Sequence, residues 1–180
     1  AVGIHKRQHA HGLWPLLRKL SVALYKQGKY SEASKNFHHA LLHSKQAMNH
    51  LEVADLLYKR GVCLSHLKKH SRAWSCFDKA LSFSEVATRP ERILYYHERA
   101  KSGQMCGKHA DAVTDFTRVL SLNPSDHRAL FRRGWSNKAL GLFLSAAEDF
   151  EAAKLAAPGE SVYKLNYRAI GNLECVVLGR

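Results

Sequence analysis

Histidines and cysteines are the side chains of this chain that could hold a metal ion or attack a substrate. The sequence contains 12 His and 4 Cys. His39 and His43 are four residues apart, a spacing that can place two imidazoles on one face of a helix, as in some zinc sites. Neither an acid nor a Cys follows at a matching position. Two ligands do not complete a site, so we predict that the chain binds no metal.

The cysteines favour packing over chemistry. No two of them form a Cys-x-x-Cys pair, which favours a reducing compartment. Cys63 and Cys76, thirteen residues apart, could approach each other, but a cysteine inside a helical protein usually fills a small apolar space. The sequence also lacks a Gly-rich phosphate loop, a His-Glu-x-x-His helix and a nucleophile elbow. We therefore expect neither catalysis nor a bound cofactor.

The elements that would position a binding site follow from a pattern in residues 127–160. Small residues at Gly134 and Ala146 would let two antiparallel helices approach closely, and Phe150 would fill the space between them. Pro158 would follow the second helix, because proline cannot continue one. The pattern residues in order are Leu130, Gly134, Gly141, Phe143, Ala146, Phe150, Ala153 and Pro158.

Three earlier segments repeat this pattern. Its phenylalanine recurs at Phe37, Phe77, Phe116 and Phe150, with separations of 40, 39 and 34 residues, so six and five extra residues lie between the first three copies. The other matching residues are Tyr96, Ala100, Gly107, Ala112, Val119 and Pro124 in the third copy, Leu57, Gly61, Ala73 and Ala80 in the second, and Leu17, Gly28, Tyr30, Ala33 and Ala40 in the first. A helix-turn-helix unit of this period resembles the tetratricopeptide repeat.

The resemblance implies an all-α fold, a right-handed superhelical solenoid with a C-terminal capping helix. The four repeats would cover residues 14–47, 54–87, 93–126 and 127–160. Residues 1–13 lack helical periodicity, and we expect a flexible basic lead-in. Residues 161–180 carry an apolar stripe that suits a capping helix, with the first helix of a fifth repeat as the alternative.

The two insertions differ in kind. The first contains no Pro or Gly, so it should lengthen the second helix of repeat one or the first helix of repeat two. The second, Thr88 to Arg92, places a hydroxyl three residues ahead of a Glu with Pro in the first turn, which is typical of a capped helix start. Neither insertion predicts a domain linker.

Positive charge is concentrated near the N-terminus. The net charge is +13, and residues 1–50 hold eight Lys and Arg against one acid, Glu32. Such a charge favours acidic partners, anionic lipid or nucleic acid at the encounter stage, or simply a solvated surface. No apolar run approaches the roughly 20 residues that span a bilayer, and no signal peptide precedes the first repeat. We expect an intracellular, cytoplasmic protein, with organellar import as an alternative if a signal has been removed.

In the tetratricopeptide-repeat family, the first helix of each repeat lines the concave side of the superhelix. Carried onto this chain, the resemblance predicts a basic groove with aromatic anchors, the residue types enriched at binding hot spots. The groove residues would be Arg128, Phe131, Arg132, Trp135 and Lys138 of repeat four, His97, Lys101 and Gln104 of repeat three, and Tyr58 of repeat two. An acidic or amphipathic segment of another protein would fit there. The alternative is that Trp135 merely packs against a neighbouring helix.

One variant of the family, the carboxylate clamp, grips the acidic tail of heat-shock chaperones with Lys, Asn and Arg. Arg128 and Arg132 match its last two positions, but Tyr58, Val62 and Glu98 stand where Lys, Asn and Asn belong. We therefore do not expect that tail as the partner.

The sequence predicts a protein-interaction scaffold or adaptor, similar in kind to co-chaperones, that binds a peptide segment in its concave groove. One alternative is a basic helical-repeat subunit of a larger particle, contacting RNA or another anionic surface through its N-terminal end. The other is an accessory domain of an enzyme.

Overall fold

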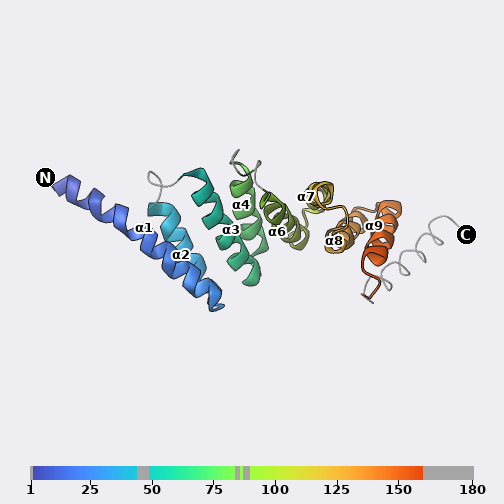
Figure 1. Cartoon of the computed structure of the whole chain (residues 1–180), viewed down its shortest axis with the longest axis horizontal. Coiled ribbons are helices and arrows are strands. Elements are labelled where there is room, and N and C mark those ends of the chain that lie inside the picture. The colour runs from blue at the N-terminus through green and yellow to red at the C-terminus, as the bar shows by residue number, and fades with distance from the viewer. Residues whose placement is uncertain (1, 44–48, 84–85, 87–89, 160–180) are drawn as a thin grey trace, which may run out of the picture. The chain divides into compact units, whose positions relative to one another are not determined.

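The computed structural model describes the backbone of residues 2–43, 49–83, 86 and 90–159, and their side chains except those of residues 2–12 and 43. Every regular element in these residues is an α-helix, which confirms the predicted all-α class. The helices are α1 (Val2–Lys26), α2 (Tyr30–His43), α3 (His50–His66), α4 (His70–Leu81), α6 (Arg92–Met105), α7 (His109–Leu122), α8 (His127–Ala139) and α9 (Phe143–Ala156) (Figure 1).

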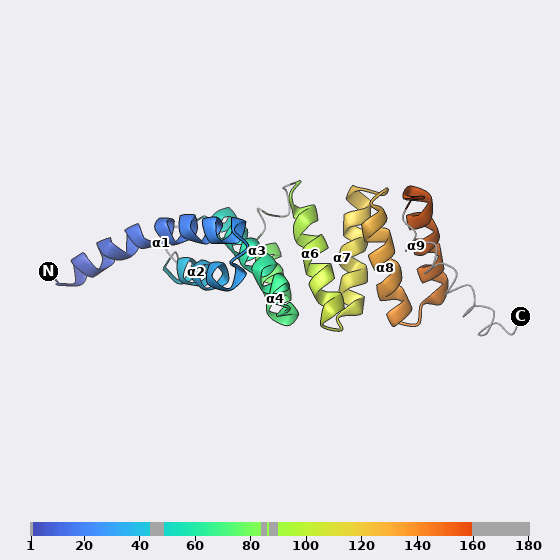
Figure 2. The ribbon, with the colours of Figure 1, turned by 90° about the horizontal axis from the view of Figure 1, so that it is seen from below.

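The chain divides into two compact units, Ala1–Glu98 and Arg99–Arg180, and the boundary falls within α6. In the first unit, α1 packs on α2, α2 on α3 and α3 on α4. In the second unit, α7 packs on α8 and α8 on α9. Each pair α1/α2, α3/α4 and α8/α9 is an antiparallel hairpin with a short connection (Figure 2).

The turns inside the hairpins need a left-handed residue. Gly28, Gly107 and Gly141 occupy this position with φ of +74°, +80° and +76°, as expected of a glycine that ends a helix. Lys68 holds the same position in the second hairpin with φ of +60°. A side chain with a Cβ is strained in this region, so the second hairpin carries a local cost that the others avoid.

In the hairpins α3/α4 and α8/α9, the core holds a phenylalanine that faces a glycine. Phe77 and Phe150 are completely buried, and each ring lies against a glycine of the preceding helix. A Cβ added at Gly61 would lie 2.6 Å from Cε1 of Phe77, and one at Gly134 would lie 2.9 Å from Cε1 of Phe150. The predicted close approach of the two helices around a phenylalanine is therefore confirmed.

Helix starts are where the structure departs most from the sequence prediction. The sequence predicts a lead-in without helical periodicity over residues 1–13, whereas α1 of the structure begins at Val2. The two glycines of this stretch do not break the helix, since a glycine within a helix costs only about 1 kcal/mol relative to alanine.

The insertions lie where the sequence indicates. α3 begins at His50, four residues ahead of Ala54, so the first insertion lengthens the first helix of repeat two, one of the two alternatives. Asn49 caps this start by accepting the Glu52 N–H at 2.9 Å. α6 begins at Arg92, within two residues of the start predicted from Pro90. The predicted capping helix, residues 161–180, and the capping role of Thr88 lie outside the described residues.

Candidate functional site

The helix that holds most of the predicted groove residues, α8, is fixed at its start by a side-chain cap. The carboxylate of Asp126 accepts the backbone N–H groups of Arg128 and Ala129, both at 3.0 Å. These bonds satisfy two of the donors that the first turn of a helix leaves open. The run Asn123 to Asp126 thus separates the end of α7 at Leu122 from α8 and caps the start of α8.

One face of α8 carries a cluster that we call the α8 aromatic surface, formed by Arg128, Phe131, Trp135 and Lys138. Their spacing of three, four and three residues places them on the same side of the helix. The Phe131 and Trp135 rings meet edge to face, with centroids 6.4 Å apart. The Lys138 ammonium lies 5.2 Å from the centroid of the Trp135 ring, within the range of a cation–π contact.

The buried Phe150 of α9 packs against both aromatic rings of this surface. Its ring centroid is 5.3 Å from that of Phe131 and 6.2 Å from that of Trp135. Trp135 nevertheless remains 43% exposed. The indole is therefore both packed and accessible, because its edge meets Phe150 while much of its surface stays open to solvent. A rigidly held aromatic ring of this kind can bind an apolar side chain with little loss of its own entropy.

Two other predicted groove residues join α6 to α8 instead of facing solvent alone. The Gln104 amide donates to the Arg132 carbonyl at 2.6 Å and to the Ser136 hydroxyl at 2.8 Å. The Arg132 guanidinium donates back to the Gln104 side-chain oxygen at 3.3 Å. These bonds hold the two first helices together, so Gln104 positions the site rather than offering a free amide to a ligand. Lys101, one turn earlier on α6, is half-buried in the same unit.

The remaining predicted residues, Tyr58 and His97, belong to the other compact unit. The Tyr58 ring packs on Phe77 at 5.7 Å and on Tyr95 at 4.6 Å. Burial, followed by the negative charge of Glu98, raises the pKa of Tyr58 to about 12. His97 lies 3.9 Å from the same carboxylate, Nδ1 to Oε1. Tyr58 is thus a packing residue of its hairpin, and the structure assigns neither residue to the α8 aromatic surface.

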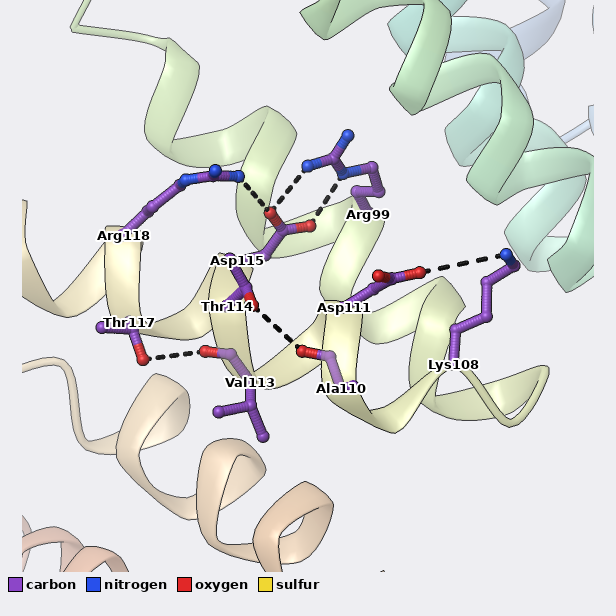
Figure 3. Close-up of polar contacts among 9 residues, drawn as sticks. All are labelled: Arg99, Lys108, Ala110, Asp111, Val113, Thr114, Asp115, Thr117 and Arg118. Carbon is purple, nitrogen blue, oxygen red and sulfur yellow. Dashed lines mark hydrogen bonds and ion pairs between the residues drawn. The ribbon is translucent and has the colours of Figure 1, made fainter. Parts of the chain in front are cut away.

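Sequence reasoning missed a buried ion pair that recurs in the second unit. Arg99 donates to Asp115 through Nε at 2.8 Å and Nη2 at 2.7 Å, and Arg118 adds a third bond at 3.1 Å (Figure 3). Thirty-four residues later, Arg133 makes the same contact with Asp149, through Nη2 at 2.6 Å and Nε at 3.0 Å. The signal was present in the sequence, because an Arg precedes an Asp by 16 residues in both repeats.

Cys63 and Cys76 do not form a pair. Cys63 packs in the cluster around Phe37, whereas Cys76 packs in the cluster around Phe77, and both thiols are free. Burial raises the pKa of Cys63 to about 11, and burial also raises the pKa of Cys76 against the opposing effect of Arg60. A thiol held protonated is a poor nucleophile, so these side chains act as core fillers.

A metal site needs several clustered ligands, and a membrane span needs a long apolar helix. Among the described residues, no three His, Cys, Asp or Glu side chains gather closely enough to hold a metal ion. Within the same part of the chain, no helix combines the length and the apolarity that crossing a bilayer requires.

Comparison with known proteins identifies the family. A family model described as tetratricopeptide repeat matches residues 18–88 and 107–161, more than half of the chain. The chain belongs to the tetratricopeptide-repeat family. It is 25% identical over 126 residues to the mitochondrial import receptor subunit TOM70 of Mus musculus, a match that covers 70% of this chain and 21% of the receptor. The chain thus spans about a fifth of this relative's length.

Solved structures show the same fold. MamA from Desulfovibrio magneticus RS-1 matches with a TM-score of 0.71 at 20% identity, over 93% of this chain and 94% of that chain. The first TPR of Spaghetti (RPAP3), bound to an HSP90 peptide, matches with a TM-score of 0.60 at 23% identity, over 68% of this chain and 94% of that chain. These likenesses confirm the repeat fold predicted from the recurring phenylalanines.

Proposed function

We propose that this chain is a protein-interaction scaffold whose α8 aromatic surface binds a segment of a partner protein. The observation that carries the proposal is the state of Trp135, which is held by Phe131 and Phe150 yet 43% exposed. Large aromatic residues that are rigid and accessible are the most frequent hot spots of protein interfaces. The peptide bound to the related RPAP3 repeat domain supports the same class of ligand.

The chemistry of the surface defines the segment it would bind. Arg128 and Lys138 lie at the two ends of the surface, about ten residues apart on one helix face, with the two aromatic rings between them. A segment with one apolar or aromatic side chain flanked by acids would place the apolar group on Trp135 and a carboxylate near each cation. The incomplete carboxylate clamp predicts that this segment differs from a chaperone tail.

Defined peptides test the proposal before a natural partner is known. Fluorescein-labelled peptides of about 12 residues, with a central Phe flanked by Glu and Asp, are titrated with the protein and compared with Lys-flanked counterparts. The peptide SRMEEVD, as found on the RPAP3 domain, serves as the chaperone-tail probe. We expect binding of the acidic peptides, and weaker binding of SRMEEVD and of the Lys-flanked set.

Two variants locate the site. Trp135→Ala should weaken binding of the acidic peptide by roughly 30-fold, equivalent to about 2 kcal/mol for a hot-spot residue. Leu155→Ala is the matched control, because this leucine is exposed on α9 outside the surface. Lys101→Ala should mainly slow association and flatten its salt dependence. Parental affinity in Trp135→Ala, with binding lost on deletion of residues 1–13, would move the site to the N-terminal end.

A further inference from the structure

The first helix exposes an apolar row beside the residues that it buries in the core of its hairpin. Leu13, Leu16 and Leu20 are 43%, 63% and 49% exposed, and Ala23 is exposed as well. Their spacing of three, four and three residues places them on one stripe of α1. Leu24, about 40° in helical angle from Leu20 at roughly 100° per residue, lies on the adjacent flank and enters the core formed with α2 and α3. We call these four residues the α1 apolar stripe.

The same positions are buried in later first helices. Leu16 corresponds to Leu56 of α3 and Ala129 of α8, and both of these residues are completely buried. Ala23 corresponds to Cys63 and Ser136, which are also completely buried. α3 packs on α2, and α8 packs on α7, so in each case a second helix of the preceding repeat is the neighbour.

Leu20 of the stripe also corresponds to a position that contacts the preceding helix in a later repeat. Leu20 corresponds to Arg133 of α8, whose guanidinium donates to the Thr117 hydroxyl of α7 at 3.2 Å. This position therefore also faces the preceding helix in a later repeat. The α1 apolar stripe matches the surface on which a helix stacks elsewhere in this chain, and its three leucines are exposed in this structure.

The charge of α1 indicates which helix fits. α1 carries five Lys and Arg among its 25 residues and no acid. Lys19 and Lys26 are both exposed and border the stripe on one side, about 60° and 80° in helical angle from Leu16 at roughly 100° per residue. A second copy of α1 would bring cations against cations, which opposes self-association. An acidic partner would instead gain from these charges.

We propose that the α1 apolar stripe binds an amphipathic α-helix of a partner protein, with Ala and Leu on its apolar face and Glu or Asp beside it. The partner helix would take the place that α2 takes on α3 and α7 takes on α8. Its apolar face would cover Leu16 and Leu20, and its acids would lie near Lys19 and Lys26. This site is on α1, in the first unit, and shares no residue with the α8 aromatic surface.

A synthetic helix serves as the probe. It is a 21-residue, lactam-stapled peptide with Ala and Leu at helical spacing on one face and Glu on both flanks; stapling keeps so short a helix folded in isolation. Its counterpart carries Lys in place of each Glu. Isothermal titration should give micromolar binding of the Glu peptide and at least tenfold weaker binding of the Lys peptide.

Variants of exposed residues place the contact. Leu16→Ser and Leu20→Ser should each weaken the Glu peptide at least tenfold, whereas Leu42→Ser, an equally exposed leucine on α2, should not. If Leu16→Ser or Leu20→Ser also lowers the melting temperature, its weaker binding could reflect unfolding. In that case the double variant Lys19→Glu with Lys26→Glu is tested instead. This variant should reverse the preference and favour the Lys peptide.

Several results would overturn the proposal. One is parental affinity in Leu16→Ser, and another is equal binding of the two peptides or no binding at millimolar concentration. A dimer in light scattering that Leu16→Ser converts to monomer would make a second copy the occupant. Binding to phosphatidylserine vesicles or to an RNA oligonucleotide that depends on Leu16, without peptide binding, would reject a protein helix as the ligand.

Discussion

Breaking the ion pair between Arg99 and Asp115 on one side should be one of the costliest single polar changes in the second unit. The Asp115 side chain is 1% exposed and accepts three bonds from two guanidinium groups at 2.7 to 3.1 Å. Asp115→Asn keeps the shape of the side chain but removes its charge, so the largely buried Arg99 loses its anionic acceptor. Breaking such a pair on one side costs about 3–5 kcal/mol. Arg118, half exposed, can return to water and reduces the expected loss to about 3 kcal/mol.

The measurement is urea and thermal unfolding followed by circular dichroism at 222 nm. For a chain of this size, a loss of about 3 kcal/mol lowers the melting temperature by roughly 6–12 °C. Asp111→Asn is the matched control, because this acid lies one turn earlier on α7, is 55% exposed, and meets Lys108 at 3.9 Å (Figure 3). Its loss should cost no more than about 0.5 kcal/mol.

A double variant separates pairing from packing. Arg99→Met with Asp115→Leu removes both charges, and should recover most of the stability lost in Asp115→Asn, because apolar side chains of similar volume can replace a buried ion pair. Equal melting of Asp115→Asn and Asp111→Asn would refute the reasoning. It would show that Arg99 finds another acceptor or reaches water when the carboxylate is gone.

Three further predictions concern the first unit. Lys68→Gly should stabilise the protein by up to about 1 kcal/mol in urea unfolding, because glycine removes the cost of a left-handed Cβ residue; an unchanged midpoint would contradict this. Tyr58, whose pKa is raised from 10.0 to about 12, should contribute stability that is complete below pH 10 and falls as pH rises from 10 to 12, since the unfolded chain loses this proton first. Thermal melts across this range should flatten in Tyr58→Phe. Cys76→Asp should raise stability by about 1 kcal/mol, since Arg60 Nε is buried with no hydrogen-bond partner among the described residues; a gain that persists in Arg60→Met would exclude pairing as its cause.

The hairpin architecture could be predicted from the sequence because it depends on residue size and spacing. A ring at Phe150 requires a small residue at Gly134. A Cβ added at Gly61 or at Gly134 would lie only 2.6 or 2.9 Å from the nearest atom of the facing phenylalanine ring, which is too close for a side chain. Such constraints recur with each repeat and can be read without knowing the partner helix. The start of α1 at Val2 could not be predicted in this way, because residues 1–13 do not show the residue spacing that marks the later helices.

The polar part of the candidate site was harder to predict. A charged or amide residue on a first helix is compatible both with solvent and with a neighbouring helix. The sequence places Gln104 on the ligand face, but its amide is used by a backbone carbonyl of α8. Asp115 escapes sequence reasoning because an acid next to a core phenylalanine suggests a surface position, although a paired acid can be buried at little cost. Whether a polar side chain finds a hydrogen-bond partner inside the protein depends on how the helices stack. The sequence of a single repeat does not specify that stacking.

The position one residue before the small core residue shows how one repeat can differ from another in function. In repeat four this position is Arg133, which Asp149 draws towards α9 and which also contacts the preceding helix. In repeat one the corresponding pair is Leu20 and Asn36, so no ion pair can form and the first helix presents an aliphatic side chain instead. Leucine needs no specific acceptor, and its stabilising effect depends on the apolar area that a neighbour covers. The polar arrangement at Arg133 therefore needs a neighbour with a hydroxyl at a fixed place, here Thr117. The α1 apolar stripe needs only an apolar helix of matching shape, and in the proposed interaction the adjacent cations favour an acidic one.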